Sequence, residues 1–187
     1  MNPSGKLPAT FPKVLADSPA HALNAYPGTN GAVNYVEGLL IGYRWFDTKN
    51  IAPQFPFGHG LSYTTFEYAD LKLVSTTGDE AVVTAEFKIA NSGKRAGPEV
   101  TQLYVQPVNP SQPRPFKELE GFKKVLLQPG EKQTVRLALD ARAFAFYDPA
   151  QKRWVAAMGT TASCWSRPAR PWIRHRWMAI PTPPAVI

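Results

Sequence analysis

Apolar and polar residues alternate in short segments over the second half of the chain, a pattern that predicts β-strands. The pattern is clearest over residues 81–91, where every second position is apolar: Val83, Ala85, Phe87 and Ile89. Because successive side chains of a strand point to opposite faces, these four would form one apolar face. Further strands are expected at 100–106, 122–127 and 134–139, with a last apolar group at 143–147 that resumes at 153–155.

Turn sequences separate these segments. Asn91-Ser92-Gly93 follows the first strand, and Gln128-Pro129-Gly130-Glu131 lies between two later ones. Proline presets the first central dihedral of such a turn, and glycine accepts the positive φ that follows. Short strands at this spacing, separated by turns, are typical of an all-β sandwich. We therefore expect a sandwich over residues 66–157.

Residues 1–63 show neither a helical nor a strand period. Seven prolines interrupt the segment, and the only helix that the pattern allows is brief, around residues 35–46. Aromatic residues are nevertheless frequent, among them Tyr26, Tyr35, Tyr43, Trp45, Phe46, Phe55 and Phe57. A long irregular segment of this kind is expected to be a connector that lies against a surface, because its aromatic side chains need cover.

Composition and charge narrow this interpretation. A chain of 187 residues with 19 prolines and 13 glycines suits one turn-rich β domain with an appendage. The net charge of +7 belongs to the end of the chain, since residues 151–187 hold six Lys and Arg and no acid. After Met158 neither strand nor helix periodicity remains, which predicts a tail at 158–187 without regular structure.

Little can be inferred about the compartment. Cys164 is the single cysteine, so no intramolecular disulfide can form. The first residues lack the apolar core of a signal peptide, and no stretch reaches the roughly 20 apolar residues of a membrane span. The localisation is therefore left open, with no export signal and no membrane span expected in this chain.

Four stretches resemble glycoside hydrolase family 3. Residues 2–12 are similar to the end of that family's α/β sandwich domain, and residues 35–47 to the segment ahead of its third domain. The most recognisable string is within 53–66, with Phe55-Pro56-Phe57-Gly58-His59-Gly60-Leu61-Ser62-Tyr63 at its centre. The fourth is spread over the predicted sandwich, at 91–93, 96–100, 102–105, 117–125 and 127–131. Together they cover residues 2–157.

The resemblance implies both a fold and an activity. Residues 1–65 would be the end of the α/β sandwich domain and a connector, and 66–157 a fibronectin type III-like domain. The parent family includes β-glucosidases, which hydrolyse terminal β-linked glucosyl residues. Its nucleophile and its acid/base lie in parts without a counterpart here, so the resemblance implies a fragment that is inactive alone. An accessory module that binds a polysaccharide or a partner protein is the alternative.

The resemblance ends after Ala157. In the family, a tryptophan at the position that Trp154 resembles is followed by a turn and a final strand of alternating apolar residues. The Arg-, Pro- and Trp-rich tail instead resembles translation in a wrong reading frame. Without the final strand, a sandwich edge would stay unpaired, so we expect low stability or association between chains. Genomic reads around the Met158 codon would test the frameshift hypothesis.

Candidate catalytic residues are few. A retaining glycosidase needs two carboxyl groups about 5 to 5.5 Å apart. Glu37 and Asp47 lie nearest the family's catalytic part, but the loop between them fixes no geometry. Glu118 and Glu120 would share one strand face and form a solvated charged edge. His59 has no second ligand at zinc spacing. We therefore predict no catalytic, cofactor-binding or metal-binding residues, and no cofactor.

Two candidate binding surfaces remain. Residues 43–46 could stack on a sugar, or they could fill the junction between the connector and the missing domains, which the resemblance favours. In the tail, Arg167, Arg170, Arg174 and Arg176 alternate with tryptophans and could bind nucleic acid, but a shifted frame yields the same composition. The expected partners are therefore the missing catalytic domains, with carbohydrate as an alternative and no specific nucleic acid.

Overall fold

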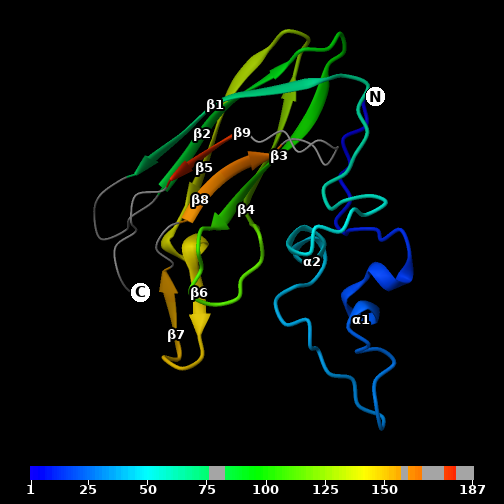
Figure 1. Cartoon of the computed structure of the whole chain (residues 1–187). Coiled ribbons are helices and arrows are strands. Elements are labelled where there is room, and N and C mark those ends of the chain that lie inside the picture. Colours follow the sequence, from blue (N-terminus) through cyan, green and yellow to red (C-terminus); the bar gives the residue numbers. More distant parts are fainter. Residues whose placement is uncertain (76–82, 157–159, 166–174, 180–187) are drawn as a thin grey trace.

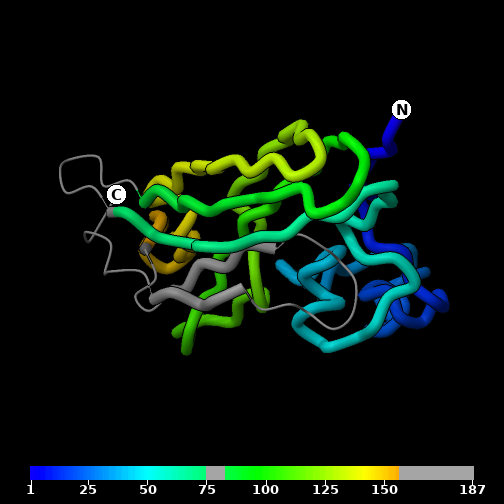
Figure 2. Tube along the Cα trace, turned by 90° about the horizontal axis from the view of Figure 1, so that it is seen from above, coloured from blue at the N-terminus to red at the C-terminus, as the bar shows by residue number. Residues whose placement is uncertain are grey.

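The computed structural model describes residues 1–75, 83–156, 160–165 and 175–179. An irregular N-terminal connector lies beside a body made of β-strands (Figure 1). Along one side of this body the connector folds back on itself, as the view from above shows (Figure 2). Within the described ranges no helix is long and apolar enough to cross a membrane.

The connector contains only short helical turns. These are η1 (Leu15–Asp17), α1 (Pro19–Ala22) and α2 (Tyr43–Thr48). The helix predicted around 35–46 is real but begins later, at Tyr43. Gly38 and Gly42 both have positive φ, and such residues interrupt a right-handed helix, so α2 can start only after Gly42. An isolated bridge between Phe11 and Phe55 joins the two ends of the connector.

Strands of the body form two facing sheets and a hairpin. One sheet has the order β1-β2-β5 and the other the order β4-β3-β8-β9, while β6 and β7 pair with each other. All pairings are antiparallel. The bounds are β1 (Phe66–Ser75), β2 (Val83–Asn91), β3 (Gly97–Pro107), β4 (Glu118–Leu127), β5 (Lys132–Leu139), β6 (Ala145–Asp148), β7 (Arg153–Ala156), β8 (Thr160–Trp165) and β9 (His175–Ala179), with η2 (Ala141–Phe144) between β5 and β6.

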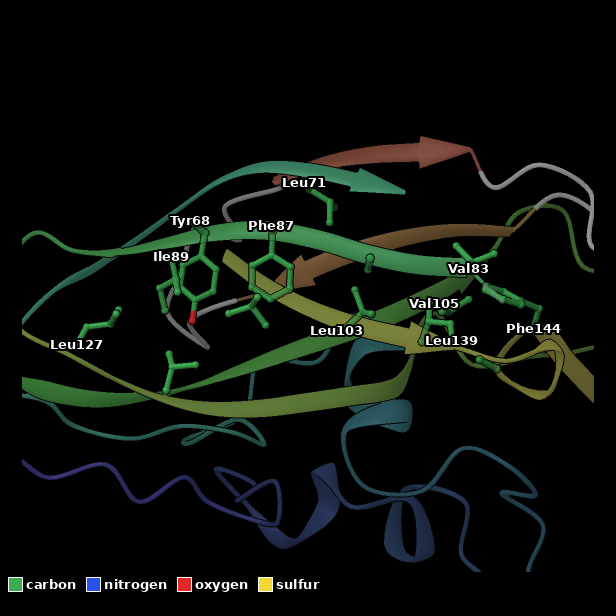
Figure 3. Packing of buried hydrophobic residues seen from close by; sticks show 14 residues of the cluster. Tyr68, Leu71, Val83, Phe87, Ile89, Leu103, Val105, Leu127, Leu139 and Phe144 are labelled. Atoms are coloured by element: carbon green, nitrogen blue, oxygen red, sulfur yellow. The ribbon is translucent and has the colours of Figure 1, made fainter. Parts of the chain in front are cut away.

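The core lies between the two sheets, as the alternation in the sequence predicts. Val83, Ala85, Phe87 and Ile89 of β2 are all buried. Val83, Phe87 and Ile89 lie in the interior with Leu103 and Val105 of β3 (Figure 3). Phe87 stacks on Tyr68 of β1, with ring centroids 6.0 Å apart. Leu127, Leu139 and Phe144 also belong to the buried cluster (Figure 3). Burial of these apolar surfaces holds the sandwich together.

The expectation of a structureless tail and a missing final strand is wrong for two segments. β8 pairs antiparallel with β3, from Gln102 opposite Trp165 to Pro107 opposite Thr160, and β9 pairs with β8. Pairing of strands uses backbone donors and acceptors, so a segment without apolar alternation can still extend a sheet. The other tail residues, and with them the rest of the predicted tail, lie outside the described residues.

Candidate functional site: the junction of connector and sandwich

A buried ion pair joins the connector to the sandwich. Oδ2 of Asp47, at the end of α2, lies 3.3 Å from Nζ of Lys117, which immediately precedes β4. The two side chains are only 11% and 5% exposed, respectively. The Lys117 ammonium also lies 4.7 Å from the ring centroid of Tyr104 in β3. Asp47, which the sequence did not support as a catalytic residue, therefore pairs with a cation from the sandwich.

Each charge of this pair depends on the other. Burial raises the pKa of the Asp47 carboxyl, and the Lys117 ammonium opposes that rise. Burial likewise lowers the pKa of Lys117, and the Asp47 carboxylate opposes the fall. Removing one partner would leave an uncompensated charge in a desolvated place, which is costly. The pair is therefore suited to holding two segments in register, not to exchanging protons with a substrate.

Two side chains of α2 satisfy backbone groups around the start of β4. The backbone N–H of Leu119 donates to the Tyr43 hydroxyl over 2.8 Å, and that of Phe116 donates to Oγ1 of Thr48 over 2.9 Å. The Tyr43 ring packs between Phe57 and Tyr104, at centroid distances of 5.0 and 5.8 Å. Burial raises the pKa of Tyr43. The helix thus covers the first residues of β4.

The other aromatic residues of α2 face into the connector. Trp45 and Phe46 are each 4% exposed, and the Trp45 indole N–H donates to the carbonyl oxygen of Asp17 over 3.0 Å. A ring that stacks on a sugar must present an open face. Trp45 and Phe46 have no such face here, so residues 43–46 fill the inside of the connector and its junction with the sandwich.

A cluster of charges lies next to the ion pair. Glu118 is contacted by Arg44 from α2, at 3.5 Å, and by Arg114 from the preceding loop. The prediction that Glu118 belongs to a solvated edge is wrong, because its side chain is only 15% exposed. The partner Arg44 is distant in sequence, so the strand pattern could not reveal this contact. Burial, with the neighbouring Glu118, raises the pKa of Glu120 to about 7, against the effects of Arg44 and Arg114.

The remaining candidates do not form a site in the structure. Among the described residues, no hydrogen bond or ion pair joins Glu37 to Asp47. The His59 ring packs at a tilt against Phe55 with centroids 5.2 Å apart, and the His59 backbone carbonyl accepts a hydrogen bond from the N–H of Leu7. No group of three or more His, Cys, Asp or Glu side chains in the described ranges could hold a metal ion.

Sequence reasoning missed two further anchors of the connector. Nζ of Lys6 pairs with the Glu99 carboxylate at 3.1 Å, and both side chains are largely buried. Asn91 is fully buried and accepts a hydrogen bond of 2.6 Å from the Thr64 hydroxyl. Its amide nitrogen donates to the carbonyl oxygens of Arg95 and Leu127. The sequence did contain a sign of both anchors, because the polar residues Asn91 and Glu99 occupy core-facing positions of the alternation in β2 and β3.

Taken with the two facing antiparallel sheets, the comparisons define a class of domain. The fibronectin type III-like domain family matches residues 99–162. This match reaches beyond Ala157, where the resemblance was expected to end. The predicted fold class, an all-β sandwich of this type behind an extended connector, is confirmed.

Individual relatives identify the parent family. Thermostable β-glucosidase B of Acetivibrio thermocellus is 51% identical over 160 residues, which are 85% of this chain and 21% of that protein. β-Glucosidase BoGH3A of Bacteroides ovatus is 43% identical over 162 residues, 85% of this chain and 22% of that protein. The crystal structure of DesR, a β-glucosidase from Streptomyces venezuelae in complex with D-glucose, matches with a TM-score of 0.85 and 37% identity, covering 97% of this chain and 23% of that one.

The chain belongs to glycoside hydrolase family 3, as a C-terminal region of its β-glucosidases that includes their fibronectin type III-like domain. It spans about a fifth of the length of the two curated relatives. The predicted family resemblance is thereby confirmed.

Proposed function

We propose that this chain is the non-catalytic C-terminal part of a β-glucosidase-type enzyme that hydrolyses terminal β-linked glucosyl residues. In that enzyme it would fix the connector against the sandwich and present it to the catalytic domains. The observation that carries this proposal is the buried Asp47–Lys117 pair, which makes the connector and the sandwich one unit. Alone, the chain is inactive.

The pairing of the carboxylates at the junction supports the proposal that the chain is inactive alone. Glycosidase catalysis requires one carboxyl as nucleophile or base and another as acid, both open to the sugar. Here Asp47 is paired with Lys117, Glu118 with two arginines, and Glu99 with Lys6. These pairs hold the junction and leave no carboxylate of the three available for a glycosidic bond.

The exposed apolar residues of the connector support the proposal that a partner domain covers it. Large apolar side chains of the connector have more than a third of their surface exposed: Phe11, Val14, Leu15, Leu23, Tyr26, Val33, Tyr35, Val36, Leu39, Ile41, Phe55, Leu61 and Tyr63. A concentration of apolar surface on one short segment is typical of an interface. We infer that the catalytic domains of the parent enzyme cover it.

An activity assay and a binding assay together test the proposal. The purified chain is incubated with an aryl-β-glucoside, with the full-length A. thermocellus relative as positive control, and is run by affinity electrophoresis in soluble glucans. We expect no hydrolysis and no retardation. Hydrolysis that copurifies with the chain would overturn the proposal. Retardation without hydrolysis would favour the accessory carbohydrate-binding module instead.

A further inference from the structure

Residues 29–32 form a tight hairpin turn in the connector. The N–H of Thr29 donates to the carbonyl oxygen of Ala32 over 2.9 Å, and that of Ala32 donates to the carbonyl oxygen of Thr29 over 3.0 Å. The two central residues, Asn30 and Gly31, have φ of 52° and 77°. Positive φ at both central positions is the mark of a type I′ turn, for which Asn-Gly is a preferred sequence. The turn geometry therefore explains why these two residue types stand here.

The same two residues carry the groups of a backbone reaction. After losing its proton, the backbone nitrogen of Gly31 can attack the side-chain amide carbon of Asn30. A C–N bond forms, the bond to the amide nitrogen breaks, and ammonia leaves with a proton from water, which gives a succinimide ring. Water then opens the ring at either carbonyl, to aspartate or to isoaspartate. The sum consumes water and releases ammonia, without oxidation or reduction.

The surroundings of the turn leave these groups accessible. Asn30 and Gly31 are both exposed, so water can reach the ring. In the described part of the chain the N–H of Gly31 donates no hydrogen bond. Apart from its two chain neighbours, no residue has a heavy atom within 4 Å of the position that a Cβ would take on Gly31. The attacking nitrogen is therefore neither paired nor crowded.

The turn can also open, which the attack requires because the Asn30 backbone must rotate out of its left-handed conformation. The bridge between Thr29 and Ala32 is isolated and is closed by the two hydrogen bonds alone. Residues 29–36 are all exposed, so opening uncovers no buried side chain there. Segments with few buried contacts open at low cost in free energy.

The six other asparagines of the chain lack this combination, and all of them lie in the described ranges. Asn2 and Asn109 precede proline, which has no N–H. Asn91 is fully buried, and its amide nitrogen donates to two carbonyl oxygens. The remaining three precede residues whose side chains crowd the attacking nitrogen: Asn24, Asn34 and Asn50.

We propose that Asn30–Gly31 is a site of self-modification, at which the chain converts Asn30 to aspartate and isoaspartate. Isoaspartate lengthens the backbone by a methylene group, so the two hydrogen bonds between Thr29 and Ala32 cannot both re-form. The product also places a negative charge near Val33, which is 43% exposed. This inference does not depend on the proposed function, because the reacting groups belong to this chain alone.

Peptide mapping by mass spectrometry tests the proposal on the intact chain. Asn24 is the internal control, since it is likewise exposed and has φ of 54°, but the N–H of the following Ala25 donates to the carbonyl oxygen of Ala20. The chain is incubated in heavy-oxygen water at neutral and at mildly alkaline pH. We expect Asn30 to convert at least about tenfold faster than Asn24, which corresponds to a barrier lower by about 1.4 kcal/mol.

Two signatures identify the reaction at Asn30. Conversion should be faster at the higher pH, because the attacking nitrogen must lose its proton, and the product should carry heavy oxygen from the water. If Asn30 converts no faster than Asn24, or without uptake of heavy oxygen, the proposal is wrong.

The variant Asn30→Asp separates the new charge from the lengthened backbone. It carries the charge of the product on an ordinary backbone, so the nuclear Overhauser contact between the amide protons of Thr29 and Ala32 should persist. The isoaspartyl chain, purified by ion exchange, should lose this contact. If the isoaspartyl chain keeps it as Asn30→Asp does, the modification does not disrupt the turn.

Discussion

The two buried regions of this chain are held in different ways. The centre of the sandwich interior is apolar, with Phe87, Ile89 and Leu103 at 1% exposure or less. The junction with the connector instead buries Asp47 against Lys117, and backbone amides against Tyr43 and Thr48. Apolar burial is nondirectional, whereas ion pairs and hydrogen bonds demand one geometry. The core therefore supplies stability, and the junction fixes where the connector lies.

The largest effect should come from the core. Phe87→Ala removes a fully buried ring that stacks on Tyr68, so we expect the free energy of unfolding to fall by about 3 to 5 kcal/mol. Urea denaturation measures it. Phe122→Ala is the matched control, because that ring is 69% exposed and its removal should cost less than about 1 kcal/mol. Equal losses for both variants would contradict the assignment of the core.

Breaking the junction should come next. Lys117→Met leaves the Asp47 carboxylate buried without its cation, which should weaken docking of the connector by about 3 kcal/mol. Limited trypsin digestion would then cut faster after Arg44 and Lys49, while core stability changes less. The double variant Asp47→Leu with Lys117→Met removes both charges and should regain most of the protection. If the double variant is cut as fast as the single one, the ion pair does not hold the connector.

Asn91 joins the connector to the sandwich through a buried polar network, and its removal should have an intermediate effect. Asn91→Ala leaves the Thr64 hydroxyl and the carbonyl oxygen of Leu127 without this partner, at a cost of about 2 kcal/mol. Ser92→Ala, at an exposed position, is the control for the same turn. Thermal denaturation should give a lower melting temperature for Asn91→Ala than for Ser92→Ala. Equal melting temperatures would contradict the role of Asn91.

A single carboxyl should also make the stability depend on pH. The pKa of Glu120 is raised from 4.5 to about 7 in the folded chain, so the folded state binds more protons than the unfolded state between these values. Stability from this group is therefore complete below about pH 4.5 and is lost as the pH rises to about 7. Glu120→Gln should flatten this decline. Urea denaturation midpoints between about pH 4.5 and 7 measure this decline. If the midpoint falls as steeply with pH in Glu120→Gln as in the wild type, Glu120 is not responsible.

The sequence predicted the core but not the junction, for a physical reason. A strand buries every second residue, so the alternation over 83–89 was enough to identify the interior of β2. The partner of Asp47 lies 70 residues away in a loop before β4, and no local pattern links the two. The sequence indicates that the aromatic residues Tyr43, Trp45 and Phe46 need cover, but it does not reveal that Tyr43 accepts a hydrogen bond from the N–H of Leu119.

In the tail, the sequence pattern failed to predict strands that the structure contains. Apolar periodicity predicts which face of a strand is buried, but it does not report whether backbone groups are paired. β8 lies alongside β3 although residues 160–165 lack that alternation. The unpaired backbone of β3 is the feature that decides this pairing, and it can be recognised only once the sheet has been assembled.

Hydrogen exchange of two backbone amides tests most directly whether the connector and the sandwich form one unit. The N–H groups of Leu119 and Phe116 donate to Tyr43 and Thr48 of the connector. We predict that both are protected in the intact chain, and that Tyr43→Phe and Thr48→Val each remove the protection of their own partner while β2 stays protected. Exchange of both amides at the rate of an unstructured chain would contradict the account.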